Sequence, residues 1–393
     1  MEPAPTASRV LLPVYLSTVF AMLSYSLVVV VLPFRFQALG LSLVDYGLAL
    51  GIFALGMLVT EGLWGAVAFR IGRARPLVAL GIVVLLLLVL IGVSTTFVAF
   101  ALTLGFYGAL VVYPIPLGRW LALTGGGPGT GGRGTGRYAV AFGIGLVVGS
   151  AVGPTIYSLW GFFAVTIAAL ASFAVAIFLI ARLPWEQARL PPRSSGIRAQ
   201  LPEVFTRHFV ICAMLVSLAF LAYSLPTNFL QYYSVELFHG SRADAGYVIG
   251  TYRGTQMLAG FLLGAFVDRR GPSRSAPLGF LVMAAGAAAT LFSQTYVEMV
   301  AASVLFAVGS GWLSATLLPL VLEPVPRTHQ GITVGTFGSF EDLGLLLGPV
   351  LISGAYASYG PSSAFVLVTI LALGGAALAV LARRLGYLGR RRE

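Results

Sequence analysis

The sequence GAVAFRIGRAR at residues 65–75 returns in altered form as GAFVDRRGPSR at residues 264–274. Both copies hold Gly, Arg, Gly and Arg at the same spacing, and the second starts 199 residues after the first. The same offset separates Asp45 from Asp244, and a Gly follows each of them two residues later. The chain is therefore expected to contain two copies of one structural unit.

The composition is that of a membrane protein. Of the 393 residues, 58% are hydrophobic and only 9% are charged, whereas soluble domains carry about 25% charged residues. A helix needs about 20 apolar residues to cross a bilayer, and continuous rather than alternating runs argue against a strand barrel. We predict an all-α membrane protein with twelve transmembrane helices. The twelve apolar runs are 10–34, 44–69, 76–95, 97–118, 138–160, 161–182, 208–234, 244–267, 276–293, 296–322, 331–356 and 362–385.

The basic residues predict how the chain is oriented. All 24 are Arg, against 13 acids, and 21 of them fall on one side if the N-terminus is cytoplasmic. Because basic residues collect on the cytoplasmic side, we expect a multi-pass protein of the cell (inner) membrane with both termini in the cytoplasm. The net charge of +11 is then a topology signal, and no nucleic-acid partner is expected.

The longest polar stretch divides the chain near its middle. It contains four prolines and follows the sixth apolar run. We predict an N-terminal six-helix bundle at 1–183, a cytoplasmic linker at 184–207, and a C-terminal six-helix bundle with a basic tail at 208–393.

A glycine pattern repeats between the fifth and eleventh runs. Gly149, Gly153 and Pro154 match Gly344, Gly348 and Pro349 at an offset of 195. Small residues four apart share one helix face and let backbones approach closely in a membrane. Two interpretations are open: a moving contact between the two bundles, which we favour, and ordinary tight packing.

At these motifs the chain resembles the major facilitator superfamily over essentially its full length, and most closely the twelve-span drug/proton antiporter branch. Residues 65–75 and 264–274 are similar to that family's motif A, although Phe69 replaces its acid, which the second copy keeps as Asp268. The run ending at Pro154 is similar to motif C, which the family associates with antiporters. The motif B Arg of span four is absent. The resemblance implies two pseudo-symmetric six-helix bundles and transport by alternating access.

The resemblance also implies a gate at the cytoplasmic ends of spans two and eight. An acid at a positive helix end is stabilising, and Asp268 can serve there whereas Phe69 cannot, so we expect an asymmetric gate. The alternative is that these Arg residues only set topology and contact lipid headgroups. The gating candidates of the two motif A copies are Gly65, Arg70, Gly72, Arg73, Asp268, Arg269 and Gly271.

Four charged residues fall inside the apolar runs. Arg253, Glu341 and Asp342 are expected near mid-depth, and Glu61 lies in the cytoplasmic half of span two. Intramembrane charges default to function, so one reading is that Asp342, Glu341 or Glu61 carries protons. The other is that Arg253 pairs statically with one acid. We expect Asp342 to be the carrier, because Glu341 shares the tightly packed glycine face.

The resemblance implies a substrate cavity lined by spans one, four, seven and ten. Aromatic rings with a few amides suit an amphipathic organic solute, although each ring alone is also explained by helix packing. Arg253 joins the cavity if it turns inward. The remaining cavity candidates are Tyr25, Tyr107, Tyr113, Asn228, Gln231, Tyr232 and Trp312.

We therefore expect a secondary transporter that exports small amphipathic or apolar organic compounds in exchange for protons. One alternative is an importer or facilitator of a polar or anionic metabolite that uses Arg253. Another is a receptor or lipid-binding scaffold that transports nothing. No paired nucleophile and base is present, so no enzyme activity, cofactor or metal is expected. The expected partners are a small-molecule substrate, protons and the lipid bilayer, with the chain acting as a monomer.

Overall fold

The computed structural model describes residues 7–71, 74–111, 131–182, 204–326 and 330–388, with the backbone alone at 7–11, 61–71, 74–76, 131–137 and 330–332. Over these residues the regular structure is helical throughout. The helices are α1 (Ala7–Ala38), α2 (Leu43–Ile71), α3 (Ala74–Val93), α4 (Phe97–Val111), α6 (Gly131–Ala181), α8 (Arg207–Asn228), α9 (Leu230–Glu236), α10 (Arg242–Arg270), α11 (Pro272–Phe292), α12 (Tyr296–Leu322), α13 (Gln330–Tyr359) and α14 (Pro361–Arg384).

The predicted all-α membrane fold class is confirmed. Among the described residues, eight helices are long and apolar enough to cross a membrane, and α3 and α4 hold shorter apolar stretches. Each of the twelve predicted runs overlaps a helix or one part of α6. Large apolar side chains also face outward, such as Phe261 (72% exposed) and Phe292 (80% exposed), as expected where lipid rather than water surrounds the protein.

Two predicted spans share the single helix α6, which a kink at Gly161 (φ 78°, ψ −179°) divides. This positive φ favours glycine, and the predicted join at Trp160-Gly161 is therefore where the chain reverses. Gly360, 199 residues later, joins α13 to α14 with almost the same backbone angles (φ 85°, ψ 178°). A predicted boundary needs correction in the seventh span, 208–234, because Phe229 interrupts it and separates α8 from α9.

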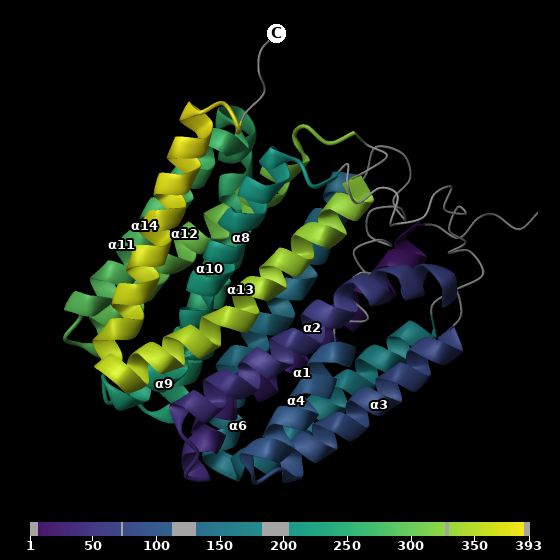
Figure 1. Cartoon of the computed structure of the whole chain (residues 1–393). Helices are drawn as coiled ribbons and strands as arrows, with labels where there is room; N and C mark the ends of the chain where they lie inside the picture. Colours follow the sequence, from purple (N-terminus) through teal and green to yellow (C-terminus); the bar gives the residue numbers. More distant parts are fainter. Residues whose placement is uncertain (1–6, 72–73, 112–130, 183–203, 327–329, 389–393) are drawn as a thin grey trace, which may run out of the picture.

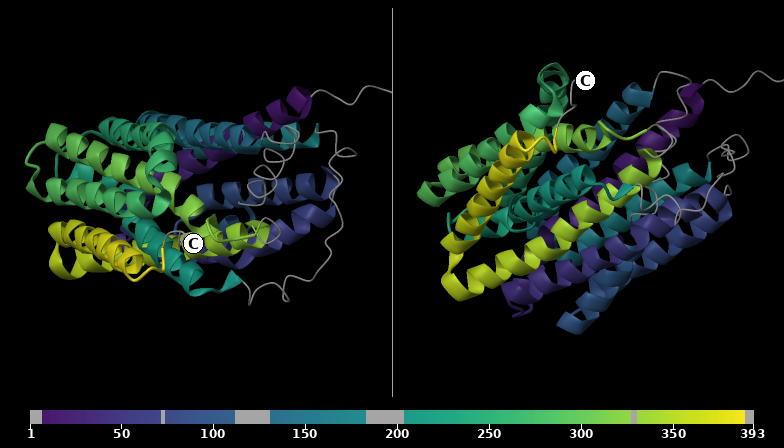
Figure 2. Two further views of the ribbon diagram at one scale, coloured as in Figure 1. Left: turned by 90° about the horizontal axis from the view of Figure 1, so that it is seen from above. Right: turned by 45° about the horizontal axis from the view of Figure 1, so that its top comes forward.

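The helices form two groups, the N-terminal half (α1 to α6) and the C-terminal half (α8 to α14) (Figure 1). Within the first, α1 packs along α6 and α2 packs on α4; within the second, α11 lies between α12 and α14, and α13 packs along α8. The halves meet mainly where α2 contacts α13 and where α6 contacts α10. Figure 2 shows the two groups side by side from two further directions.

The two ends of the molecule differ in their connections. The terminal end holds the start of α1 and the end of α14, and the far end holds the short turns 39–42 and 237–241 with Gly161 and Gly360. The predicted cytoplasmic linker, 184–207, lies mostly outside the described residues. The proposed division of the chain at this linker therefore stays a prediction.

The repeated acids of the sequence begin equivalent helices. Asp45 Oδ2 accepts hydrogen bonds from Ser42 N (2.9 Å) and Ser42 Oγ (2.7 Å), and Asp45 N donates to Ser42 Oγ (3.1 Å). Ser241 and Asp244 form the same capping box at the start of α10, with distances of 2.8, 2.7 and 3.1 Å. A capping box satisfies helix-end donors, so this part of the repeat has a structural role.

Candidate functional site

The halves contact one another through two equivalent pairs of glycines. On α2, a Cβ at Gly47 would lie 2.6 Å from the Pro349 carbonyl oxygen of α13, and one at Gly51 would lie 2.9 Å from Val350. On α10, a Cβ at Gly246 would lie 2.6 Å from the Ala151 carbonyl oxygen of α6. Gly250, equivalent to Gly51, also faces Ala151. A larger residue would collide with the facing helix, so the α2–α13 and α10–α6 contacts both depend on glycine.

The glycines predicted from motif C lie elsewhere. A Cβ at Gly149 would meet the Ser26 side chain of α1 at 2.7 Å, and one at Gly153 would meet Val30 of α1 at 2.8 Å. In the second copy, Gly348 faces Ser224 of α8. The favoured interpretation places these glycines at a moving contact between the two bundles. Instead, the glycine face of α6 packs on α1 and that of α13 packs on α8, so it lies inside each half, and a different face of each helix meets the other half.

Pro154 and Pro349 lie within α6 and α13 next to these glycines. Pro349, predicted from the repeated glycine pattern, contacts the other half, because its carbonyl oxygen lies against Gly47 of α2. Any role of these residues in gating stays a prediction.

Arg253 crosses between the halves at the centre of the molecule. Its side chain is only 5% exposed, and Nη1 donates to Ser26 Oγ of α1 at 3.0 Å. Ser26 in turn donates to the Leu146 carbonyl oxygen (2.8 Å) and lies 2.7 Å from Ser150 Oγ. Since a serine hydroxyl has one proton, Ser150 must donate to Ser26. Ser26 therefore accepts two hydrogen bonds and donates one.

The predicted residues Arg253, Asp342 and Tyr25 come together at this centre. Arg253 and Asp342 both lie close enough to the Tyr25 phenol to interact with it electrostatically, as does Tyr223. Asp342 is buried, at 5% exposed. This centre therefore holds two charged side chains that are both removed from water, which is rare inside a membrane.

The other predicted acids are less defined. Glu341 is half-buried on α13. Glu61, Gly65 and Arg70 lie on α2 where only the backbone is described, and Tyr113, Gly72 and Arg73 lie outside the described residues. An approach of Glu61 to Asp342 therefore stays a prediction.

The aromatic cavity candidates do not form one cluster. Tyr25 stacks on Phe53 (5.8 Å between ring centroids), which packs against the buried Tyr107 (6.0 Å). Tyr232 contacts Tyr356 near the far end (6.3 Å). Trp312 packs edge-on against Phe266 (5.2 Å), deeper toward the terminal end. These rings contribute to helix packing at three depths.

Four cavity candidates nonetheless hold buried polar atoms without a hydrogen-bond partner in the described part of the chain. They are Arg253 Nε, Gln231 Oε1, Trp312 Nε1 and the Tyr107 hydroxyl. Because native buried polar groups are nearly always hydrogen-bonded, such atoms point to a bound solute or water.

The far end is closed by contacts that sequence reasoning missed. Gln37 Nε2 donates to Glu236 Oε1 (2.6 Å), and the Tyr46 hydroxyl donates to the Asn228 carbonyl oxygen (3.0 Å). The Asn228 carbonyl also accepts from Gln231 Nε2 (2.7 Å). Asn228, predicted as a cavity residue, thus contacts the other half through its carbonyl oxygen, whereas Gln231, also predicted there, bonds within its own half. Gln37 and Glu236 are 199 residues apart, so the repeat offset was a signal for this pair.

The second motif A copy ends α10. Gly271 (φ 83°) caps the helix, and its N–H donates to the Val267 carbonyl oxygen. Asp268 and Arg269 are exposed, and the Arg270 guanidinium lies over the Phe266 ring at 4.9 Å. The role expected for Asp268 at a positive helix end stays a prediction.

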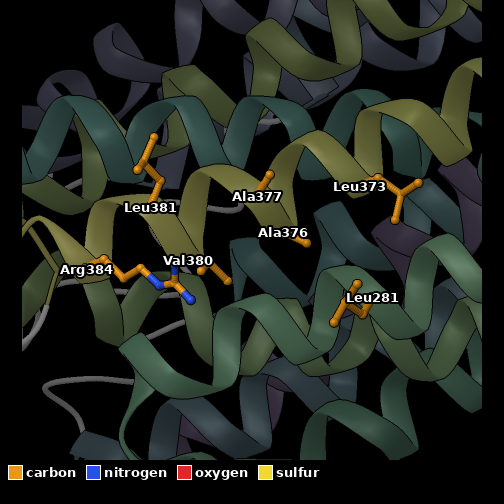
Figure 3. Close-up of a pocket in the computed structure, with 7 residues that line it drawn as sticks. All are labelled: Leu281, Leu373, Ala376, Ala377, Val380, Leu381 and Arg384. Atoms are coloured by element: carbon orange, nitrogen blue, oxygen red, sulfur yellow. The ribbon is translucent and has the colours of Figure 1, made fainter.

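An apolar groove of about 430 Å³ lies between α11 and α14. Figure 3 shows its aliphatic lining and the single charged side chain, Arg384, at one end. The groove contains none of the predicted site residues. Its lining residues are Leu281, Leu373, Ala376, Ala377, Val380, Leu381 and Arg384.

Solved structures share this fold. The crystal structure of a bacterial homologue of the human lysosomal transporter Spinster, inward-facing and occupied, aligns with a TM-score of 0.79 at 16% identity over 99% of this chain and 100% of that chain. The nucleoside transporter NupG gives 0.77 at 15% over 96% and 99%. The human organic anion transporter MFSD10 (TETRAN) gives 0.71 at 18% over 96% and 100%. At these identities the likeness shows the fold alone.

The sequence also matches known proteins. An uncharacterized MFS-type transporter of Bacillus subtilis (strain 168), YfiU, is 28% identical over 152 residues, which is 38% of this chain and only 28% of that protein. The Major Facilitator Superfamily model matches residues 14–241 and 212–392. With its helical fold and matching profile over nearly the whole length, this chain belongs to the Major Facilitator Superfamily and is a membrane transporter.

Proposed function

We propose that this transporter exports small amphipathic or apolar organic compounds in exchange for protons, with the bundles 1–183 and 208–393 rocking about the linker 184–207. The protein would act as a monomer in the cell (inner) membrane with both termini in the cytoplasm. In that orientation the terminal end faces the cytoplasm. Closure at the far end then corresponds to a state that faces inward.

The observation that carries this proposal is the set of unpartnered polar atoms on Gln231, Arg253 and Trp312. Gln231 is near the far end, whereas Arg253 and Trp312 lie roughly 17 Å and 24 Å along helices that start there, at 1.5 Å per residue. A solute that moves through the molecule would meet them in turn. Their aromatic neighbours supply apolar contact area, which suits an amphipathic compound.

Proton coupling is proposed to run through Asp342. Burial disfavours the charged form of a carboxyl, and a nearby cation favours it. Asp342 is buried close to the same phenol as Arg253. Any movement of Arg253 relative to Asp342 would therefore change the proton affinity of Asp342, which is what coupling requires.

A second candidate function is uptake of an organic anion, which the buried Arg253 Nε favours. A guanidinium that donates to a neutral hydroxyl retains donors for a carboxylate or phosphate. In this reading Arg253 binds the substrate rather than tuning an acid.

The test is solute-induced proton movement in proteoliposomes with a pH-sensitive dye inside. The panel contains lipophilic cations, neutral amphipathic compounds, nucleosides and organic anions. Proton movement with cations or neutral compounds supports the proposal, and anion uptake without proton movement supports the second candidate. Silence across the panel contradicts both and favours a non-transporting receptor or scaffold. Glu298→Gln is the control for loss of an acid, because Glu298 only caps α12.

A further inference from the structure

We propose that Ser26 and Ser150 form the acceptor site for Arg253 on the N-terminal half. We call the hydrogen bond from Arg253 to Ser26 the tie, and propose that it sets the equilibrium between the inward-facing and outward-facing states. The inference rests on alternating access. It assigns a positioning role to two residues that no motif identifies. It also gives Gly149, one of the motif C glycines, a definite task.

The hydroxyl pair is arranged to receive a cation. Ser26 and Ser150 are fully buried, and the proton of Ser26 is committed to the Leu146 carbonyl oxygen. With Ser150 donating to it, Ser26 Oγ presents its remaining lone pair to Arg253 Nη1 at 3.0 Å. Hydrogen bonds to a charged donor are stronger than neutral ones. The bond joins α1 to α10 and so exists only while the halves are close.

Gly149 makes this arrangement possible. A Cβ there would lie 2.7 Å from Ser26 Cβ and 2.8 Å from the Leu23 carbonyl oxygen. Its absence lets α6 approach α1 until the Ser150 and Ser26 hydroxyls touch. The glycine therefore positions the acceptor, although it does not itself contact the other half.

The tie exists on one side of the molecule only. Gly149 meets Leu23 O and Ser26 Cβ, and Gly348, at the offset of 199, meets Leu221 O and Ser224 Cβ in the same pattern. Ser224 therefore takes the place of Ser26 in the C-terminal half. At the same offset Pro349, which has no hydroxyl, takes the place of Ser150, and Ala54 takes the place of Arg253. The second interface thus has neither the cation nor the pair of hydroxyls.

This asymmetry predicts a switch. When the far end opens, α10 separates from α1, and Arg253 loses Ser26. A charged group that shares its surroundings is Asp342, since both act on the Tyr25 phenol. We expect the guanidinium to pass from the hydroxyl pair toward this carboxylate, so Ser26 competes with Asp342 for one cation.

The experiment measures the two facing states directly. Spin labels on cysteines at Ala38 and Ser358, exposed far-end positions on opposite halves, report distances, while the native Cys212 is buried. Ser26→Ala should shift the ratio of the two states about tenfold toward the open far end, as expected for loss of a charge-assisted hydrogen bond. Ser150→Ala should give a smaller shift, because Ser26 remains. Ser224→Ala is the matched control, since Ser224 is equally buried but bonds only within α8.

A mutant cycle separates the tie from simple loss of packing. Ser26→Ala added to Arg253→Gln should shift the ratio no further than Arg253→Gln alone, because the bond to Ser26 has already been removed. Equal shifts from Ser26→Ala and Ser224→Ala, or additive shifts in the cycle, would overturn the tie. If Arg253→Gln does not fold, the comparison with Ser224→Ala still decides.

The outcome also distinguishes the tie from the proposed function. If added solute changes the distances but Ser26→Ala does not, alternating access stands and the tie is overturned. If neither solute nor any variant changes them, both are overturned.

Discussion

Gln37 and Glu236, which occupy equivalent positions in the two copies of the repeat, hydrogen-bond to each other across the far end at 2.6 Å. Equivalent residues can meet only where the pseudo-twofold axis passes. The axis that relates the halves therefore emerges between α1 and α9. The closure of the far end is built around that point, with the Tyr46–Asn228 bond and the Tyr46–Phe229 ring contact (5.5 Å) beside it.

Loss of the Tyr46 hydroxyl should loosen this closure. Tyr46→Phe keeps the ring on Phe229 but removes the hydrogen bond to Asn228, which is worth about 1 kcal/mol. We expect a several-fold rise in the open far-end state, measured by the distance between labels at Ala38 and Ser358. Tyr252→Phe is the control, because that hydroxyl bonds only to Ser310 in its own half. No difference between the two variants would show that the bond does not hold the closure.

Gly153→Leu should destabilise the N-terminal half. Its Cβ would lie 2.8 Å from Val30 and 3.1 Å from the Leu27 carbonyl oxygen, so α1 must move away from α6, at a cost of about 1–3 kcal/mol. Transport should be lost together with a lower unfolding temperature. Gly354→Ala, where nothing lies within 4 Å, should leave the unfolding temperature unchanged or raise it. Loss of transport at normal stability would instead revive a moving contact at Gly153.

Asp342→Asn should separate proton coupling from substrate movement. The variant is expected to lose proton-driven accumulation but to keep exchange of substrate at equal concentrations, since exchange needs no net proton movement. The readout is dye acidification alongside labelled-substrate exchange in one vesicle preparation. Glu341→Gln serves as the neighbouring comparison. Normal acidification by Asp342→Asn would pass the carrier role to Glu61.

Asp268→Asn should shift the facing equilibrium more than Phe69→Ala. Only the second motif A copy keeps its acid, and an acid near a helix N-terminus is worth about 0.3–1 kcal/mol. Labels at Arg182 and Arg274, exposed positions of opposite halves, would report the terminal end. Equal shifts from the two variants would remove the basis for an asymmetric gate.

The sequence predicted the spans well because bilayer thickness imposes its length on every apolar run. It also drew attention to Arg253 and Asp342, since charge inside an apolar run stands out whatever the helix packing; both are buried at one centre, and their roles stay predictions. The face on which Gly153 packs was not predictable from its spacing. A spacing of four defines a face but not the helix that it meets.

Ser26 could not be found from the sequence. A lone serine in an apolar span resembles any helix residue that bonds to its own backbone, and its role depends on α6 and α10 lying beside it. Gly47 and Gly246, by contrast, follow the repeated acids at the common offset of 199. Their equivalence was present in the sequence, and only their contact with the opposite half required the structure.

The one-residue joints at Gly161 and Gly360 tie the interface mechanically to the surrounding bilayer. Each links a helix segment that meets the opposite half to a more peripheral one, α6 across its own kink and α13 to α14, with no slack between them. If α13 or the first part of α6 tilts, the more peripheral segment joined to it must therefore tilt as well. Bilayer thickness sets the free-energy cost of helix tilt. The transport rate of this protein should therefore differ between thin and thick membranes.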